Sequence, residues 1–187
     1  MTLRSRPVLL SPLSSHSLSR LLHLPKDEVD QVLEDLHAIL DIPEDSNRPL
    51  RLLHLSFRDF LLDKNRCGDL SFWVDEMQAH RMLADSCIRL MSTSLKQDIC
   101  GVDSPGRLAT DVASSRVKQC LPAEVQYACL YWIHHLQRSG SQLNDDDQVH
   151  KFLQEHLLHW LEALGWMRNV SEGIHAITSL ESIALVS

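Results

Sequence analysis

Apolar residues at helical spacing are the feature of this sequence that most limits its folds. In the segment 148–165 an apolar side chain recurs every three or four residues, so one helix face is apolar throughout. Strand-like character is confined to 41–55, where the polar residues 43–47 separate two short apolar runs. The pattern therefore predicts a mainly α-helical protein. The same helical spacing recurs in four other segments: 26–40, 72–95, 122–140 and 171–186.

The first third of the chain predicts a winged-helix domain, which we place at residues 1–66. A short helix that ends at Leu22 is followed by the amphipathic helix 26–40 and then by the hairpin 41–55, whose polar turn is the wing. A further helix comes next. Two helices joined by a tight turn and followed by a hairpin are the element order of a winged helix.

The remaining residues, 67–187, predict a helical domain built as an antiparallel bundle or a solenoid-like array. Gly140 and Gly165 are placed to end two of its helices. Ile174, Ile177 and Ile183 lie at near-helical spacing in the last helix, which ends without a polar cap. We expect these isoleucines to be exposed, so that the C-terminal helices support self-association.

The composition indicates a cytoplasmic chain. Among the 187 residues no stretch approaches the length of a membrane span, and the apolar run Val8–Leu10 is too short for the core of a signal peptide. We therefore expect no membrane partner and five reduced cysteines. The formal net charge of −7 and the acidic face of helix 26–40 also argue against nucleic acid as a partner.

The motifs of catalysis are missing from the sequence. It contains no glycine-rich phosphate loop and no G-x-S-x-G elbow, so we expect a protein that is not an enzyme and has no catalytic residue. We expect His150, His156 and His159 to be structural or surface residues rather than metal ligands. No cysteine or carboxylate joins them at a spacing typical of a metal site. The tryptophans at helical spacing are expected to anchor the core.

One histidine stands apart from the others. Residues 51–62 read RLLHLSFRDFLL, so His54 follows an apolar run and directly precedes a helix that Ser56 begins, with Asp59 at the spacing of a capping box. The pattern leaves two interpretations open. His54 either ends the strand and bonds locally to the backbone, or it contacts a partner outside this chain.

The sequence resembles fungal NACHT-type STAND proteins, the nucleotide-switched relatives of NOD-like receptors that are associated with heterokaryon incompatibility. The resemblance extends from about Val8 to Ile183 and rests on these blocks: RPLRLLHLSFRDFLLDKNRCGDLSFWVDEMQAHRMLADSCIRLMSTSLKQDICGVDSPG, QCLPAEVQYACLYWIHHLQRSG, HKFLQEHLLHWLEALG and SEGIHAITSLESI. It implies the winged-helix and helical segment that follows a NACHT ATPase module, and a chain that is a fragment or a stand-alone remnant.

The resemblance also implies a role for His54. In such proteins a histidine in the pattern apolar-x-His-x-Ser-Phe-x-acidic-Phe contacts the β-phosphate of ADP, and His54, Ser56, Phe57, Asp59 and Phe60 fit it. The implied function is nucleotide-dependent autoinhibition. The implied partner is a NACHT module in cis or in trans, and ADP or ATP would be a cofactor only with that module. The alternative is a stand-alone winged-helix adaptor that binds nucleic acid or protein.

Overall fold

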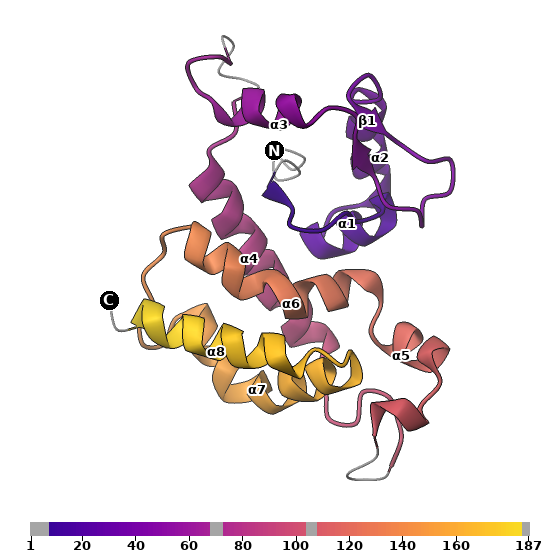
Figure 1. Cartoon of the computed structure of the whole chain (residues 1–187), viewed down its shortest axis with the longest axis vertical. Coiled ribbons are helices and arrows are strands. Elements are labelled where there is room, and N and C mark those ends of the chain that lie inside the picture. The colour runs from indigo at the N-terminus through magenta and orange to yellow at the C-terminus, as the bar shows by residue number, and fades with distance from the viewer. Residues whose placement is uncertain (1–7, 68–72, 104–107, 185–187) are drawn as a thin grey trace.

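The computed structural model describes residues 8–67, 73–103 and 108–184, and these residues form eight α-helices, a short 3-10 helix and a two-stranded sheet. The protein is mainly helical, as the apolar periodicity predicts. In Figure 1 the helices α7 and α8 lie toward one end of the molecule, α1, α2, α3 and the sheet lie at the other, and α4 and α6 cross the middle. The elements are α1 Ser15–Leu22, α2 Lys26–Glu34, β1 Leu40–Asp41, β2 Arg51–Leu52, α3 Leu55–Leu62, α4 Glu76–Ser94, η2 Ala109–Asp111, α5 Ser114–Cys120, α6 Ala123–Arg138, α7 Gln148–Trp166 and α8 Val170–Ala184.

Helix α2 is shorter than the periodicity predicts. It ends at Glu34 rather than at residue 40, because residues 35–39 turn back to bring the chain into the sheet. The backbone bonds there run over three residues, from Leu36 N–H to Leu33 O and from Ile39 N–H to Leu36 O. The apolar spacing nevertheless continues through the turn, because Leu36 and Ile39 still pack on the same small core.

The predicted hairpin is confirmed as an antiparallel pair. Leu40 lies opposite Leu52, and Asp41 lies opposite Arg51. Helices α1 and α2 pack on this sheet through a small buried cluster, which we call the N-terminal cluster: Leu18, Val29, Leu33, Leu40 and Leu50. The element order agrees with the predicted one, while the winged-helix identity of this region stays a prediction.

Helix α3 begins one residue earlier than predicted. Its N-cap residue is His54, in an extended conformation, and the His54 carbonyl accepts the Phe57 N–H at 3.2 Å. Ser56 therefore lies inside the first turn instead of capping it, and the predicted capping box with Asp59 is wrong. The helix begins early because strand β2 already ends at Leu52, so the chain turns into α3 soon after the strand.

The larger core lies among α4, α6 and α7. Trp132 of α6 and Trp160 of α7 are both fully buried and meet edge to face, with ring centroids 5.6 Å apart. These two tryptophans are core anchors, as expected. Trp73 and Met77 depart from the predicted apolar stripe: Trp73 precedes α4 and is half-buried, and Met77 is 57% exposed. Helix α4 starts only at Glu76, after the Asp75 cap, so Met77 lies in the first turn of the helix, where its side chain is exposed.

Helices α6 and α7 each end where a residue takes the left-handed conformation, and that residue is a glycine only in α6. Gly140 ends α6 as predicted, in a left-handed conformation with φ 63°. Gly165 does not end α7, which continues to Trp166. There Arg168 takes the left-handed conformation with φ 59°, and its N–H bonds to the Gly165 carbonyl. The reversal satisfies the last carbonyls of the helix without a glycine.

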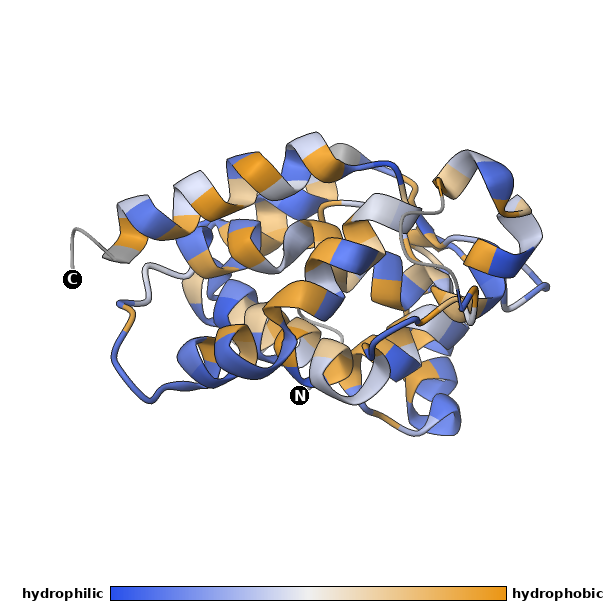
Figure 2. Cartoon of the chain, turned by 90° about the horizontal axis from the view of Figure 1, so that it is seen from below, coloured by the Kyte–Doolittle hydropathy of each residue, from blue (hydrophilic) through white to orange (hydrophobic). Residues whose placement is uncertain are grey.

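Helix α8 packs along α7 and α6 and leaves one side open. Its Gly173 sits against Leu164, where an added Cβ would lie 2.6 Å from the leucine Cδ1 atom. Ile174 and Ile177 are exposed, as predicted, and Figure 2 shows hydrophobic bands on α8 at the surface. Ile183 differs from the prediction, because it is half-buried and packs against the main core.

The main core also includes residues from the start of the described chain. Val8, Leu13 and Leu21 belong to the same buried cluster as the helices α4, α6 and α7. The division of the chain between residues 66 and 67 stays a prediction. Across the described ranges, no helix combines the length and the apolar character needed to cross a membrane.

Candidate functional site

His54 lies at the junction of the sheet and α3, with an exposed side chain. Its φ of −135° and ψ of 125° continue the extended backbone of β2 into the helix cap, and the imidazole makes no capping bond. The side chain is exposed, so it is accessible to a partner outside the chain.

His54 lines an open pocket of about 340 Å³. Phe57 and Phe60, one turn apart on α3, form one wall, with ring centroids 6.0 Å apart. Ile39 and Ser56 complete the lining together with Arg66. Histidine, serine and arginine side chains all donate hydrogen bonds to phosphate oxygens, and aromatic rings provide an apolar surface beside them. The chemistry of the pocket is therefore suited to an anion attached to an apolar or aromatic group.

Arg66 is the pocket residue that the sequence pattern does not single out. It belongs to a turn directly after α3, where Asp63 accepts backbone N–H groups through both its carbonyl and its carboxylate. The Arg66 N–H bonds to the Asp63 carbonyl at 3.2 Å. This turn brings the chain back toward α3 and places the cationic Arg66 in the same pocket lining as His54. Asp63 was the sequence signal for this turn, because aspartate side chains commonly accept backbone N–H groups in turns.

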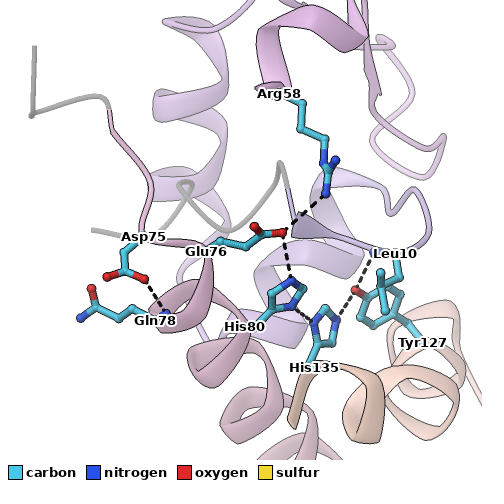
Figure 3. A network of polar contacts seen from close by, with 8 residues as sticks. All are labelled: Leu10, Arg58, Asp75, Glu76, Gln78, His80, Tyr127 and His135. Atoms are coloured by element: carbon cyan, nitrogen blue, oxygen red, sulfur yellow. Dashed lines mark hydrogen bonds and ion pairs between the residues drawn. The ribbon is translucent and has the colours of Figure 1, made fainter. Parts of the chain in front are cut away.

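A polar network lies behind α3 and connects it to the helical body (Figure 3). Arg58 of α3 reaches the Glu76 carboxylate at the start of α4 at 3.8 Å. The same carboxylate oxygen lies 3.8 Å from Nε2 of His80, whose side chain is fully buried. The Nδ1 atom of His80 then meets Nδ1 of His135 on α6 at 2.7 Å.

The network continues from His135 to the beginning of the described chain. The Nε2 atom of His135 lies 2.7 Å from the Tyr127 hydroxyl, which accepts the Leu10 N–H at 3.2 Å. One direction of donation fits the close contacts of this network, although at 3.8 Å from Glu76 the buried Nε2 atom of His80 has no hydrogen-bond partner among the described residues. The Tyr127 O–H donates to His135, His135 donates to His80 from Nδ1, and His80 directs its Nε2–H at the Glu76 carboxylate. The reverse direction would point a lone pair of His80 at a carboxylate oxygen.

Burial keeps both histidines of this pair neutral. The pKa of His135 is lowered to about 3, mainly by burial and to a smaller extent by the neighbouring His80 and Arg138. Burial also lowers the pKa of His80, with a smaller opposing effect from Glu76. The Tyr127 pKa is raised, again mainly by burial, so its hydroxyl keeps the proton that it donates. The pair therefore consists of two neutral rings joined by one N–H proton, which His135 Nδ1 donates to His80 Nδ1.

His134 and His135 are adjacent in the sequence and lie on different faces of α6. His134 is exposed and His135 is fully buried. The partnership of His135 with His80 was missed, because 55 residues separate them. The usable signal was a histidine on the buried side of each helix, since a buried polar ring needs a partner.

The three histidines of α7 do not converge on one point. His150 accepts the Asp146 N–H through Nδ1, and its Nε2 lies 2.7 Å from the Gln154 amide nitrogen. His156 and His159 approach each other at 3.4 Å between their Nδ1 atoms. Within residues 8–67, 73–103 and 108–184, no three His, Cys, Asp or Glu side chains are grouped so that they could hold a metal ion.

The fold and the pocket define a mainly helical protein with an exposed histidine and arginine beside two aromatic rings. The chain is similar to vegetative incompatibility protein HET-E-1 of Podospora anserina, with 33% identity over 197 aligned residues. The alignment covers 92% of this chain and 14% of HET-E-1. The chain is therefore a relative of a fungal incompatibility protein, and it spans about one seventh of that relative's length.

Other comparisons return no match. No protein-family model matches the chain, and no solved structure matches it significantly. The resemblance to fungal incompatibility proteins is thus confirmed at the level of a single related protein. The NACHT module and the winged helix remain predictions.

Proposed function

We propose that this chain is the regulatory and interaction segment of a nucleotide-switched fungal incompatibility protein. Its role is to pack on a NACHT ATPase module and hold that module in the ADP-bound state, with no enzymatic activity of its own. The observation that carries the proposal is the exposed His54 on the rim of a pocket that also contains Arg66. The similarity to HET-E-1 over nearly the whole chain supports the incompatibility context.

The pocket supplies the chemistry that such a contact requires. His54 donates a hydrogen bond to a terminal phosphate oxygen of ADP, and Arg66 adds a fixed positive charge from the turn after α3. The pocket is open, so the nucleotide would be held mainly by the ATPase module and would only touch this chain. Loss of the contact would then loosen the packing of the two parts.

The test is a binding experiment with a NACHT module from the same organism, loaded with ADP. We expect a complex that His54→Ala weakens about 10-fold or more, because a hydrogen bond to a charged group contributes about 1.5–3 kcal/mol. Arg66→Ala should weaken it in the same direction. The matched control is His37→Ala, since His37 is also exposed but lies outside this pocket.

Two outcomes would count against the proposal. One is the absence of any complex with ADP, with ATP and without nucleotide. The other is an equal loss of binding in the His37→Ala and His54→Ala variants. A salt-dependent shift of random duplex DNA at near-physiological ionic strength would instead favour the stand-alone adaptor. The structure offers no support for that alternative, because α2 carries Asp27, Glu28, Asp30 and Glu34 against Lys26.

A further inference from the structure

Two pairs of histidines in this molecule face each other through their Nδ1 atoms, and the pairs differ in separation and in burial. The Nδ1 atoms of His80 and His135 are 2.7 Å apart, and both side chains are fully buried. The Nδ1 atoms of His156 and His159 on α7 are 3.4 Å apart, and both residues are half-buried. The first separation is that of a short hydrogen bond, whereas the second exceeds the usual distance of about 2.9–3.0 Å.

The longer separation is suited to two ligands of one zinc ion. Zinc binds imidazole nitrogens at about 2.0–2.1 Å in tetrahedral geometry, which places two ligand nitrogens about 3.3–3.4 Å apart. His156 and His159 meet this distance. His80 and His135 are too close for it, and their burial leaves an ion no access. The pair on α7 is therefore the one whose geometry fits a metal.

The core and a neighbouring carboxylate fix the orientation of the His156 ring. The ring stacks on Phe152, with centroids 5.7 Å apart and an interplanar angle of 22°. Phe152 is itself 2% exposed and packs against Trp132 of the main core. The Nε2 atom of His156 lies 3.8 Å from the Glu155 carboxylate. A carboxylate beside Nε2 favours the tautomer with its proton there, so that Nδ1 keeps the lone pair that a metal needs.

His159 comes from the same face of the same helix. Residues three apart are neighbours on a helix surface, so the spacing of the two rings is set by α7, which runs without interruption from Gln148 to Trp166. The rings are tilted by 57°, with centroids 5.6 Å apart. Zinc binding requires only that the His159 proton move from Nδ1 to Nε2 by exchange with solvent, so the ring stays neutral.

The third histidine of α7 does not complete the site. The Nδ1 atom of His150 accepts the Asp146 N–H, and its Nε2 atom contacts Gln154. Across the described ranges no further His, Cys, Asp or Glu side chain joins the pair in a group that could hold a metal ion. Zinc would thus take two ligands from this chain and keep two positions for water or for a donor from a partner.

We propose that His156 and His159 form a two-ligand zinc site on α7. Zinc and similar divalent transition metals bind imidazole nitrogen, whereas Mg²⁺ and Ca²⁺ bind oxygen ligands. The sequence favours a structural role for these histidines because a third ligand at a regular spacing is missing. The tertiary structure adds the measured approach of the two Nδ1 atoms, which needs no third residue.

The test is a calorimetric titration of the whole folded chain and its variants with zinc chloride. We expect His156→Ala and His159→Ala each to weaken zinc binding about 10-fold or more, because each removes one arm of a chelate. The double variant should bind no more weakly than either single variant, since one remaining imidazole gives no chelate. His150→Ala on the same helix and His134→Ala, at an exposed position of α6, are the matched controls and should leave the affinity unchanged. Magnesium chloride should give no binding.

Three results would overturn the proposal. They are no zinc binding by the unsubstituted chain, an unchanged affinity in both single variants, or losses that add in the double variant, which would indicate independent sites. Because His156 packs against Phe152, His156→Gln is a second variant that keeps most of the side-chain volume, and it should also weaken binding. Circular dichroism checks that each variant folds. The experiment does not involve His54 or its pocket, so its failure would leave the proposed function unaffected.

Discussion

The N-terminal cluster and the main core differ in how their buried residues are supplied. The N-terminal cluster has five buried aliphatic residues from two short helices and a sheet with two residues in each strand. The main core joins the long helices α4, α6 and α7 around two buried tryptophans. The first region carries the exposed His54 and its pocket, and the second buries most of the apolar surface.

This difference teaches that stability and the candidate site reside in different parts of the molecule. A small cluster with a solvent-facing pocket opens at a lower free energy than a large core, so its surface is suited to a partner. The two parts are joined by the buried network and by an ion pair between Arg20 of α1 and the buried Glu124 of α6 at 2.7 Å. The following predictions test this division, beginning with the largest effect.

Trp160→Ala breaks the main core. Trp160 is fully buried, meets Trp132 edge to face, and donates its Nε1–H to the Cys129 carbonyl at 2.9 Å. We expect the free energy of unfolding to fall by about 3–5 kcal/mol in urea titrations, because a large cavity remains and the hydrogen bond to the Cys129 carbonyl is lost. Leu158→Ala on the same helix is the control. Leu158 is 76% exposed, so a change of about 0.5 kcal/mol or less is expected. Similar losses in both variants would contradict this view of the core.

Leu33→Ala tests the N-terminal cluster. We expect a loss of about 2–4 kcal/mol, since Leu33 is 2% exposed and packs between α2 and the sheet. Amide hydrogen exchange should accelerate more in β1 and β2 than in α6 if the two regions open separately. Val32→Ala is the matched control, because the adjacent Val32 is 38% exposed. Equal acceleration in α6 would show that the two regions open as one unit.

Mild acid tests the link between the regions. The pKa of His135 is about 3 in the folded chain against an ordinary value of 6.5, so the unfolded chain binds this proton at a higher pH. The stability that depends on neutral His135 is therefore present above pH 6.5, and it is lost as the pH falls below that value. Near about pH 5 the loss from His135 should reach about 2 kcal/mol relative to neutral pH.

The measurement is the free energy of unfolding as a function of pH in matched variants. His135→Gln should flatten the slope between neutral and mildly acidic pH, because its side chain cannot take up the proton. His134→Gln, which changes the exposed neighbour, should keep the slope of the unsubstituted chain. Parallel curves for all three proteins would mean that burial of His135 has no part in the acid response.

Several elements follow directly from local patterns. The end of α6 at Gly140 and the turn between β1 and β2 depend on neighbouring residues, and the prediction of each is confirmed. The failures occur where distant contacts decide. The end of α2 depends on entry into the sheet. The end of α7 depends on Arg168, which takes the left-handed conformation and leaves Gly165 inside the helix.

The candidate site shows the same limit. His54 could be singled out because its motif lies within one short segment, whereas the role of Arg66 depends on how a turn folds back. The buried pair of His80 and His135 could not be predicted from the sequence, since it joins two separate helices. Spacing along a chain carries no information on which helices become neighbours.

The sequence by itself determined the helical class and the position of the hairpin and singled out His54, because helix periodicity, turn chemistry and motif spacing act within a few residues. The tertiary structure alone decided which polar groups would be buried together. That outcome depends on packing between helices, where a buried polar group must find a partner from any element within reach. The acid response that we predict comes from such a contact.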